Sequence, residues 1–356
     1  MIDWLDSVGD PSRSHVEGLT VRAALEEARQ QVAALFGARS REVCFTSGAT
    51  EAIAAACWGG AARGTHQVVP AIEHSAVRLA ASRHGEVTWV PPDRHGRIDP
   101  DAVVAAIRED TGLVHLQWGN HEVGTVQPVA EVVRACRERG VLVHIDAAQA
   151  AGRVPVDFRG LGADLMSISA HKLGGPPGVG ALLVRLGIRL PPLLVGGDQE
   201  RARRAGYENV PALVGFGAAC AALSQPGALD REASEQRRLS SRVLNAIGEV
   251  GQREGLPGVG LYGHPEQRLP HLVCLGFADI EPQAVLLGLD RAGVAAHSGS
   301  ACSSEDFEPS PVLEAMGVDA HHSLRVSFGW SSTDPDVDRL LEALPGVLAE
   351  LRALAG

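Results

Sequence analysis

Strand-like and helix-like segments alternate along the first half of this chain, and this alternation restricts its fold more than any other feature. Short apolar runs with strand character are mostly separated by segments with helical periodicity. The expected strands are 42–46, 67–70, 87–90, 113–118, 141–145, 164–169 and 179–185, and the expected helices are 21–36, 50–62, 75–82, 99–109 and 129–139. Such alternation is typical of an α/β domain, so we expect a mostly parallel seven-stranded sheet covered by helices.

The pattern changes after about residue 224. The expected elements there are a long polar helix (229–250), a strand (271–277), a helix (282–292), a short strand (294–297), a strand (323–328) and a final helix (335–354). This order predicts a smaller α+β domain. We therefore expect a large α/β domain over 15–226 and a small domain over 227–356 that also includes the N-terminal segment 1–14, in keeping with a length of 356 residues.

Charge and cysteine usage exclude several classes of protein. The formal net charge is −11 and no Lys/Arg-rich block is present, so we expect no direct binding to nucleic acid or to a membrane surface. No run approaches the roughly 20 apolar residues of a membrane span, and the acidic first ten residues do not resemble a signal peptide. The six scattered cysteines form no Cys-x-x-Cys pair, which predicts free thiols, no metal site and a cytoplasmic location.

The chain contains 31 arginines and a single lysine, Lys172. A lysine amine forms a Schiff base with a carbonyl compound, whereas an arginine guanidinium stays protonated and does not. Lys172 lies in Ser-Ala-His-Lys-Leu-Gly-Gly, directly after an expected strand, where open α/β sheets bind ligands. The alternative is that one lysine remained by chance in an arginine-biased sequence.

Polar motifs follow other expected strands. Thr-Ser-Gly-Ala-Thr-Glu (46–51) opens a helix and is suited to phosphate, although Thr50 is alternatively a simple helix N-cap. Ser169 and His171 directly precede Lys172 in Ser-Ala-His-Lys and are further candidates for phosphate binding. Asp146, in His-Ile-Asp-Ala-Ala-Gln, is placed to face a pyridinium nitrogen or, alternatively, to cap a helix.

Two further residues are candidates near the C-terminus. Cys302 lies in Ser-Gly-Ser-Ala-Cys-Ser-Ser, where small residues predict an accessible thiol, or a surface loop with an incidental cysteine. Arg325, in the expected strand 323–328, is able to pair with a carboxylate through two hydrogen bonds, but one arginine among 31 is weak support by itself.

Taken in this order, the motifs resemble those of the NifS/IscS-like cysteine desulfurases, in the class V aminotransferase branch of fold-type I pyridoxal-phosphate (PLP) enzymes. Glu-His-Ser-Ala-Val (73–77) and Asn-x-Glu-Val-Gly-Thr (120–125) also match, and the resemblance runs from Asp10 to the last helix. It implies a PLP enzyme that converts L-cysteine to L-alanine, transfers sulfur to Cys302 as a persulfide and delivers it to an acceptor protein. It also implies a homodimer.

The resemblance assigns roles to the matching residues. Lys172 would hold PLP and move the substrate α-proton, His74 would stack on the ring and take part in proton transfer, and Cys302 would attack the substrate sulfur. The other implied site residues are Asp146 at the pyridine nitrogen, Gln149 at the phenolic oxygen, Ala49, Thr50, Ser169 and His171 at the phosphate, and Asn120 and Arg325 at the substrate.

The chain departs from the family pattern at a few positions. The usual Tyr-Leu-Asp-x-x-Ala-Thr-Thr-like segment has no counterpart before Asp10. His121 replaces the second asparagine of Asn-Asn-Glu, a cofactor-site residue, and keeps a hydrogen-bonding side chain. Tyr207 replaces the threonine that reaches the partner subunit's phosphate in the family, and it keeps a hydroxyl on a larger side chain.

Two other functions remain open from the sequence. A selenocysteine lyase or related class V PLP lyase would not need Cys302, and it would keep its activity in a Cys302→Ala variant. A weakly active PLP-bound subunit of a sulfur relay would show the cofactor's absorbance but no turnover until a partner protein is added.

Overall fold

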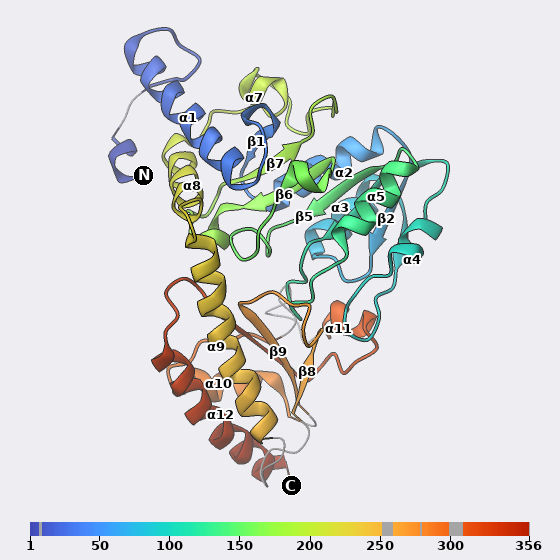
Figure 1. The fold of residues 1–356 in the computed structure, drawn as a ribbon, viewed down its shortest axis with the longest axis vertical. Helices are drawn as coiled ribbons and strands as arrows, with labels where there is room; N and C mark the ends of the chain where they lie inside the picture. The colour runs from blue at the N-terminus through green and yellow to red at the C-terminus, as the bar shows by residue number, and fades with distance from the viewer. Residues whose placement is uncertain (7–8, 251–258, 278–279, 299–308, 356) are drawn as a thin grey trace. The chain divides into compact units, whose positions relative to one another are not determined.

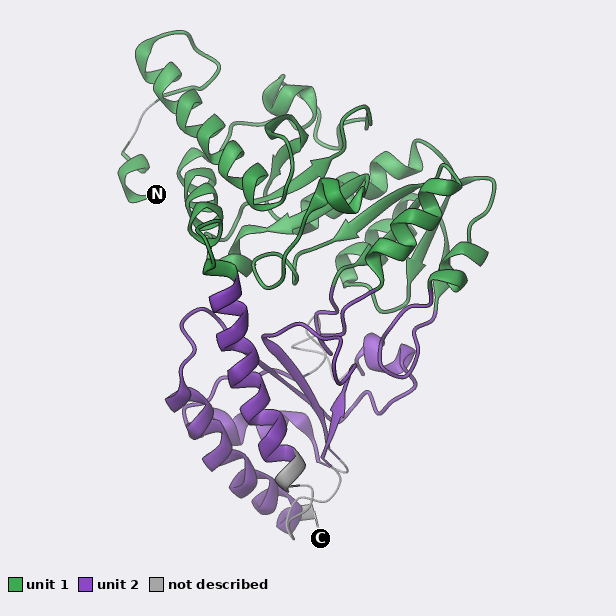
Figure 2. Cartoon of the chain, in the orientation of Figure 1, with its two compact units in different colours: residues 1–90, 100–118, 128–229 green, residues 91–99, 119–127, 230–356 purple. Residues whose placement is uncertain are grey.

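The computed structural model describes residues 1–6, 9–250, 259–277, 280–298 and 309–355, which form two compact units. Unit 1 comprises 1–90, 100–118 and 128–229, and unit 2 comprises 91–99, 119–127 and 230–356 (Figure 2). The N-terminal segment, which we expected in the smaller domain, belongs to unit 1. The helix η1 (Ile2–Trp4) contacts helix α8 (Val210–Leu223), and the Tyr207 hydroxyl donates to the Gly9 carbonyl at 2.7 Å.

Unit 1 contains the predicted seven-stranded, mostly parallel sheet (Figure 1). The strand order is β1-β7-β6-β5-β4-β2-β3. Only β7 runs antiparallel to its neighbours. The strands are β1 (Val43–Thr46), β2 (His66–Pro70), β3 (Glu86–Val90), β4 (Thr111–Gln117), β5 (Leu142–Asp146), β6 (Leu165–Ser169) and β7 (Gly180–Val184). All residues of the central strands are buried, as expected for a sheet covered on both faces.

Helices cover the sheet because each buries an apolar stripe against it. Helix α2 packs on the strands together with α3, and α5 packs on β4 and β5. The helices of unit 1 besides η1 and α8 are α1 (Val16–Leu35), η2 (Ser40–Glu42), α2 (Ala49–Ala61), α3 (Ser75–His84), α4 (Pro100–Ala105), α5 (Val129–Glu138), α6 (Phe158–Leu161), η3 (Ala170–Leu173) and α7 (Gln199–Ala202). Helix α4 ends earlier than predicted, because the Arg108 amide bonds to the Thr111 hydroxyl instead of continuing the helix.

The strand register brings distant motifs to one edge of the sheet. Thr46 at the end of β1 and Ser169 at the end of β6 are both paired with Gly180, at the start of β7. A Cβ atom on Gly180 would lie 2.7 Å from the Gly48 Cα and 2.4 Å from a backbone oxygen, so only glycine fits between these segments. Asp146 ends β5 beside Ser167 of β6. These strand ends carry most of the residues expected in the site.

Unit 2 is an α+β unit. Its antiparallel sheet has the order β10-β9-β8, with β8 (Gly260–Tyr262), β9 (Leu272–Gly276) and β10 (Ser323–Ser327). Its helices are α9 (Ala228–Val250), α10 (Pro282–Arg291), α11 (Pro311–Ala315) and α12 (Asp334–Ala355). Apolar side chains of α9, α10, α12, β9 and β10 form one core. The predicted strand 294–297 is wrong: this segment forms a single bridge, from His297 to Arg325.

No single helix in the described part of the chain is long and apolar enough to cross a bilayer, and α8 and the following helix reach these criteria only jointly, across a sharp bend.

Candidate active site

The N-terminus of α2 forms an anion-binding turn. Its N-cap is Gly48 rather than Thr50, and no side chain caps the first amides of the helix. A Cβ atom on Gly48 would meet no atom nearer than the Ser169 hydroxyl, at 4.0 Å. The amides of Ala49 and Thr50 therefore begin a helix without a side-chain acceptor, beside a hydroxyl from another strand, as a phosphate requires.

Ser169 and His171 lie together after β6. The Ser169 hydroxyl is 2.9 Å from the Nδ1 atom of His171. Burial, and secondly the charge of Lys172, lower the pKa of His171, so its imidazole is neutral near pH 7. A neutral imidazole in contact with a hydroxyl orients that hydroxyl without introducing a further charge. Two of the four residues predicted to bind phosphate thus share one hydrogen bond, at the edge of the sheet that carries Gly48.

Asp146 ends β5 and is 7% exposed. Its Oδ1 atom accepts hydrogen bonds from the Ser167 hydroxyl at 3.1 Å and from the Ala148 amide at 3.0 Å. The amide bond forms a local turn, and the next helix after β5 is α6 (Phe158–Leu161), so Asp146 does not cap a helix. The Ser167 bond fixes the carboxylate from a neighbouring strand. Sequence reasoning missed Ser167, because its role depends on strand register.

Lys172 lies half-buried on the short helix η3, between the buried residues Ala170 and Leu173. The Arg153 guanidinium donates to the Lys172 carbonyl at 3.0 Å, and Gly174 ends the turn in the left-handed conformation at φ 88°. These backbone contacts hold η3 at the end of β6. The single lysine is therefore on the edge of the sheet where the sequence predicts it.

His74 is the N-cap of α3. Its Nδ1 atom accepts the Ala76 amide at 3.1 Å. Accepting this bond leaves the proton of the neutral ring on Nε2, so the α3 terminus sets the tautomer and the orientation of the imidazole. His74 is half-buried and presents a donor at its other ring nitrogen.

Glu73, the residue before His74, is a site residue that sequence reasoning missed. It is 1% exposed, and its Oε1 atom accepts the Gln117 amide at 2.6 Å. Its Oε2 atom has no hydrogen-bond partner among the described residues. Burial, and secondly the charge of Asp146, raise the pKa of Glu73 well above its ordinary value. The charge of Asp146 acts on Glu73 because Gln117, whose amide donates to Glu73, pairs with Asp146 on the neighbouring strand.

Unit 2 brings together three of the expected residues. Arg325 of β10 donates to the His121 carbonyl at 3.0 Å, across 204 positions of sequence. The Asn120 Oδ1 atom accepts the amides of Glu122 and Val123 at 2.8 Å each, so this amide group shapes the loop in which it lies. His121 is buried, with its Nε2 atom 3.4 Å from the Glu122 carboxylate.

Two of the remaining expected residues, Gln149 and Tyr207, lie in the described part of the chain. Gln149 is half-buried in the loop after β5. Tyr207 is 63% exposed, with its hydroxyl bonded to Gly9 within the same chain. Cys302 lies outside the described residues. The other cysteines, Cys44, Cys57, Cys136, Cys220 and Cys274, are buried free thiols, as their apolar sequence contexts predict.

The fold and the lysine at its sheet edge define an aminotransferase-type α/β protein, and residues 4–340 match the family described as Aminotransferase class-V. A cysteine desulfurase, IscS 1, of Archaeoglobus fulgidus is 41% identical over 98% of this chain and 91% of its own length. The cysteine desulfurase IscS of Methanosarcina thermophila is 40% identical over 98% of this chain and 87% of its own.

A solved structure supports the same family. A NifS-like protein superposes with a TM-score of 0.88 at 30% identity, covering 98% of this chain and 94% of that one. The chain belongs to the NifS/IscS-like cysteine desulfurases of the class V aminotransferase family.

Proposed function

We propose that this protein is a PLP-dependent cysteine desulfurase that converts L-cysteine to L-alanine and passes the sulfur to Cys302 as a persulfide. The observation that carries the proposal is the position of the only lysine. Lys172 follows β6 directly, beside the Ser169–His171 pair, while the neighbouring strand β5 ends at Asp146. Family membership supports the same activity.

The described residues fit the cofactor. The uncapped amides of Ala49 and Thr50 and the Ser169–His171 pair suit a phosphate, and the buried Asp146 carboxylate suits a protonated pyridine nitrogen. Lys172 would hold the cofactor covalently. When bound, PLP supplies an electron sink that stabilises negative charge at the substrate Cα.

The chain's own residues would handle protons and orientation. The Lys172 amine would remove the α-proton of cysteine and return it. His74, with its proton on Nε2, would stack on the ring and donate a hydrogen bond there. Arg325 would bind the substrate carboxylate, because its planar guanidinium matches two carboxylate oxygens.

Sulfur transfer is assigned to Cys302. Its thiolate would attack the substrate sulfur, forming an S–S bond as the Cβ–S bond breaks, and the electron pair of the broken bond would be protonated at Cβ to give alanine. The net change is cysteine plus a thiol to alanine plus a persulfide. Each further round requires an acceptor for the persulfide sulfur.

The proposal extends to the protein's setting. We propose a homodimer that passes sulfur to an acceptor protein in the cytoplasm. The five buried free thiols support a reducing compartment.

Purified protein with PLP and L-cysteine tests the activity. Alanine and sulfide are assayed, the Cys302 persulfide is detected by mass spectrometry, and Lys172→Ala and Cys302→Ala serve as controls. We expect Lys172→Ala to lose the bound-cofactor absorbance and all product, and Cys302→Ala to lose persulfide transfer. Cofactor absorbance without product in the wild type would instead support a partner-dependent subunit, and full activity of Cys302→Ala would support a lyase.

A further inference from the structure

The segment after β7 contains a turn with an unusual backbone. Glu200, Arg201 and Ala202 have φ values of 49°, 59° and 59°, and no other non-glycine residue among those described has positive φ. Residues with a Cβ atom carry a steric cost in this left-handed region and rarely adopt it consecutively. Such a turn persists only where its surroundings hold it in place.

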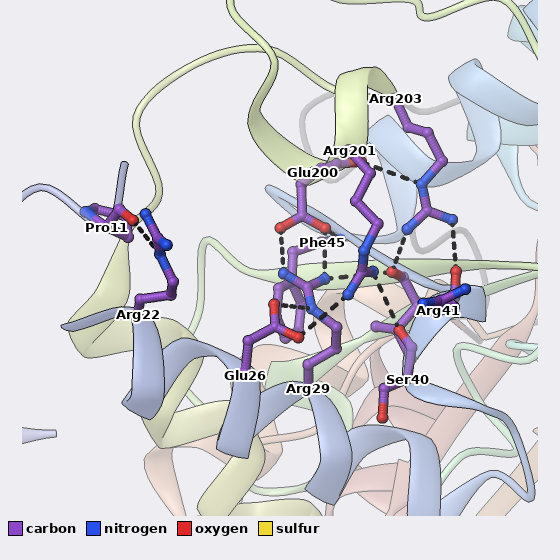
Figure 3. Close-up of polar contacts among 11 residues, drawn as sticks. Pro11, Arg22, Glu26, Arg29, Ser40, Arg41, Phe45, Glu200, Arg201 and Arg203 are labelled. Carbon is purple, nitrogen blue, oxygen red and sulfur yellow. Dashed lines mark hydrogen bonds and ion pairs between the residues drawn. The ribbon is translucent and has the colours of Figure 1, made fainter. Parts of the chain in front are cut away.

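A buried ion pair holds the first residue of the turn (Figure 3). The Arg29 guanidinium of α1 donates two hydrogen bonds to the Glu200 carboxylate, at 2.6 and 2.7 Å. The Phe45 amide of β1 donates to the same carboxylate at 2.8 Å. Both charged side chains are at most 3% exposed. The carboxylate is thus satisfied from two elements far away in the sequence, and its position fixes the turn to α1 and β1.

Arg203 stabilises the other end of the turn through hydrogen bonds to backbone carbonyls (Figure 3). Its guanidinium donates to the carbonyls of Glu200, Arg41 and Val43, at 3.2, 3.2 and 2.6 Å. These bonds engage all three of its nitrogen atoms with backbone. The chain therefore leaves the turn in one direction, which determines where the next residue lies.

That next residue, Arg204, contacts Glu51 in the anion-binding turn at the N-terminus of α2. Its guanidinium pairs with the Glu51 carboxylate at 2.8 and 3.2 Å, and the Glu51 carboxylate also accepts the Ser47 amide at 2.8 Å. Burial opposes ionisation of Glu51, but the hydrogen bonds from Arg204 and Ser47 outweigh it and lower the pKa of Glu51. The Arg29–Glu200 pair is thus linked to the 46–51 turn through the backbone from Glu200 to Arg204 and the Arg204–Glu51 ion pair.

We infer that the Arg29–Glu200 pair is a positioning device: by holding the left-handed turn 200–202, it places Arg204 on Glu51 and so fixes the anion-binding amides at the start of α2. The inference rests on the proposed function for the identity of the anion, the PLP phosphate. Arg29 and Glu200 act through Arg204, and neither is expected to touch the cofactor.

Three variants test this against a surface control. Glu200→Gln removes the charge, and Arg204→Gln removes the last link. The third variant adds Arg201→Gly and Ala202→Gly to Glu200→Gln, which removes the backbone strain at two of the three positions. Arg108→Gln, which breaks an exposed bidentate pair with Glu86, is the control. The readouts are the dissociation constant for PLP and hydrogen exchange of amides 47–52 and 196–207 in protein without cofactor, measured alongside the thermal midpoint.

We expect Glu200→Gln and Arg204→Gln each to weaken PLP binding about tenfold and to accelerate exchange at 47–52, with Arg108→Gln unchanged. Adding the two glycines to Glu200→Gln should restore most of the PLP affinity, because glycine adopts the left-handed turn without strain. A purely structural ion pair would instead lower the thermal midpoint without changing PLP affinity or exchange at 47–52, and that result would overturn the inference.

The exchange measurement separates this inference from the proposed function. If wild-type protein binds no PLP, the proposed function fails, while faster exchange at 47–52 in Glu200→Gln still supports the positioning role. If Glu200→Gln does not fold, Arg204→Gln carries the comparison, and unchanged exchange at 47–52 in that variant refutes the inference.

Discussion

Glu73 provides a sharp test of the electrostatics of the site. Its carboxyl group is buried beside Asp146 and accepts one backbone amide, with no cation bonded to it among the described residues. Two neighbouring carboxylates in a buried site do not both ionise readily, and the pKa of Glu73 is raised well above its ordinary value. We therefore expect the native protein to keep a proton on Glu73 at pH values where the unfolded chain has released it. Replacing Glu73 with glutamine, a neutral group of similar shape, removes this proton.

The sign of the effect follows from proton linkage. Above the ordinary glutamate pKa of 4.5, the native state binds one more proton than the unfolded state, so the free energy of unfolding falls as pH rises towards the raised native pKa. One proton corresponds to about 1.4 kcal/mol per pH unit across that window. In Glu73→Gln this contribution is absent, and the variant gains stability relative to wild type by about 1.4 kcal/mol for each pH unit within the window.

Urea unfolding of both proteins without cofactor, at several pH values from 5 to 8, measures this difference. The glutamine amide group that replaces the Glu73 Oε2 atom changes the free energy of unfolding by an amount that does not depend on pH. The test is therefore the dependence of this free energy on pH, not its absolute value. Glu138→Gln, at an exposed position of α5, is the matched control. Difference infrared spectra should also show loss of a neutral carboxylic acid band in Glu73→Gln.

Parallel pH profiles for wild type and Glu73→Gln would refute the reasoning, because they would mean that Glu73 is ionised in the native protein. An unchanged infrared band would refute it independently of any unfolding model. A slope difference that also appears in Glu138→Gln would show that general charge, not burial beside Asp146, is responsible.

Three further predictions concern other parts of the chain. Burial lowers the pKa of His115 to about 3, so the native state resists protonation that the unfolded chain accepts below about pH 6.5, and stability falls as pH decreases through that range. His115→Gln should reduce the acid slope of urea unfolding by up to about 1.4 kcal/mol per pH unit, and an identical slope would contradict this. Iodoacetamide should modify one cysteine of the native protein and none in Cys302→Ser. Burial raises the pKa of the Cys57 thiol to about 12, and the other described thiols are also buried. Mass spectrometry that finds further modified cysteines would refute this. Arg325→Lys should raise KM for cysteine about tenfold or more with a smaller change in kcat, since one ammonium replaces a two-bond guanidinium contact, and an unchanged KM would exclude the carboxylate role.

The α/β architecture was readable from the sequence because parallel strands buried on both faces are short continuous apolar runs between amphipathic helices. The prediction was weakest where that signal is absent. The sequence does not predict helix α8, since almost all of its residues are apolar and no period distinguishes a face. The predicted strand at 294–297 is wrong, because a short apolar run does not reveal whether a neighbouring strand pairs with it along its length.

The sequence by itself determined which groups end the strands. Lys172, Asp146 and Ser169 were identifiable because reactive and polar residues directly after apolar strands are unusual, and parallel strands bring their ends to one edge. Only the tertiary structure decided what surrounds these groups. Ser167 reaches Asp146 through strand register, and burial raises the pKa of Glu73.

The left-handed turn at Glu200 is the clearest case of a feature that the tertiary structure decides and the local sequence does not. No local property of Glu-Arg-Ala favours three consecutive positive φ angles, and propensity argues against them. Arg29 stabilises the turn from 171 residues away, through a bidentate contact that exists only once α1 and β1 are packed together. Local sequence sets backbone preferences and apolar periodicity, whereas contacts between distant side chains require the folded chain, and those contacts determine the charge and geometry of the site.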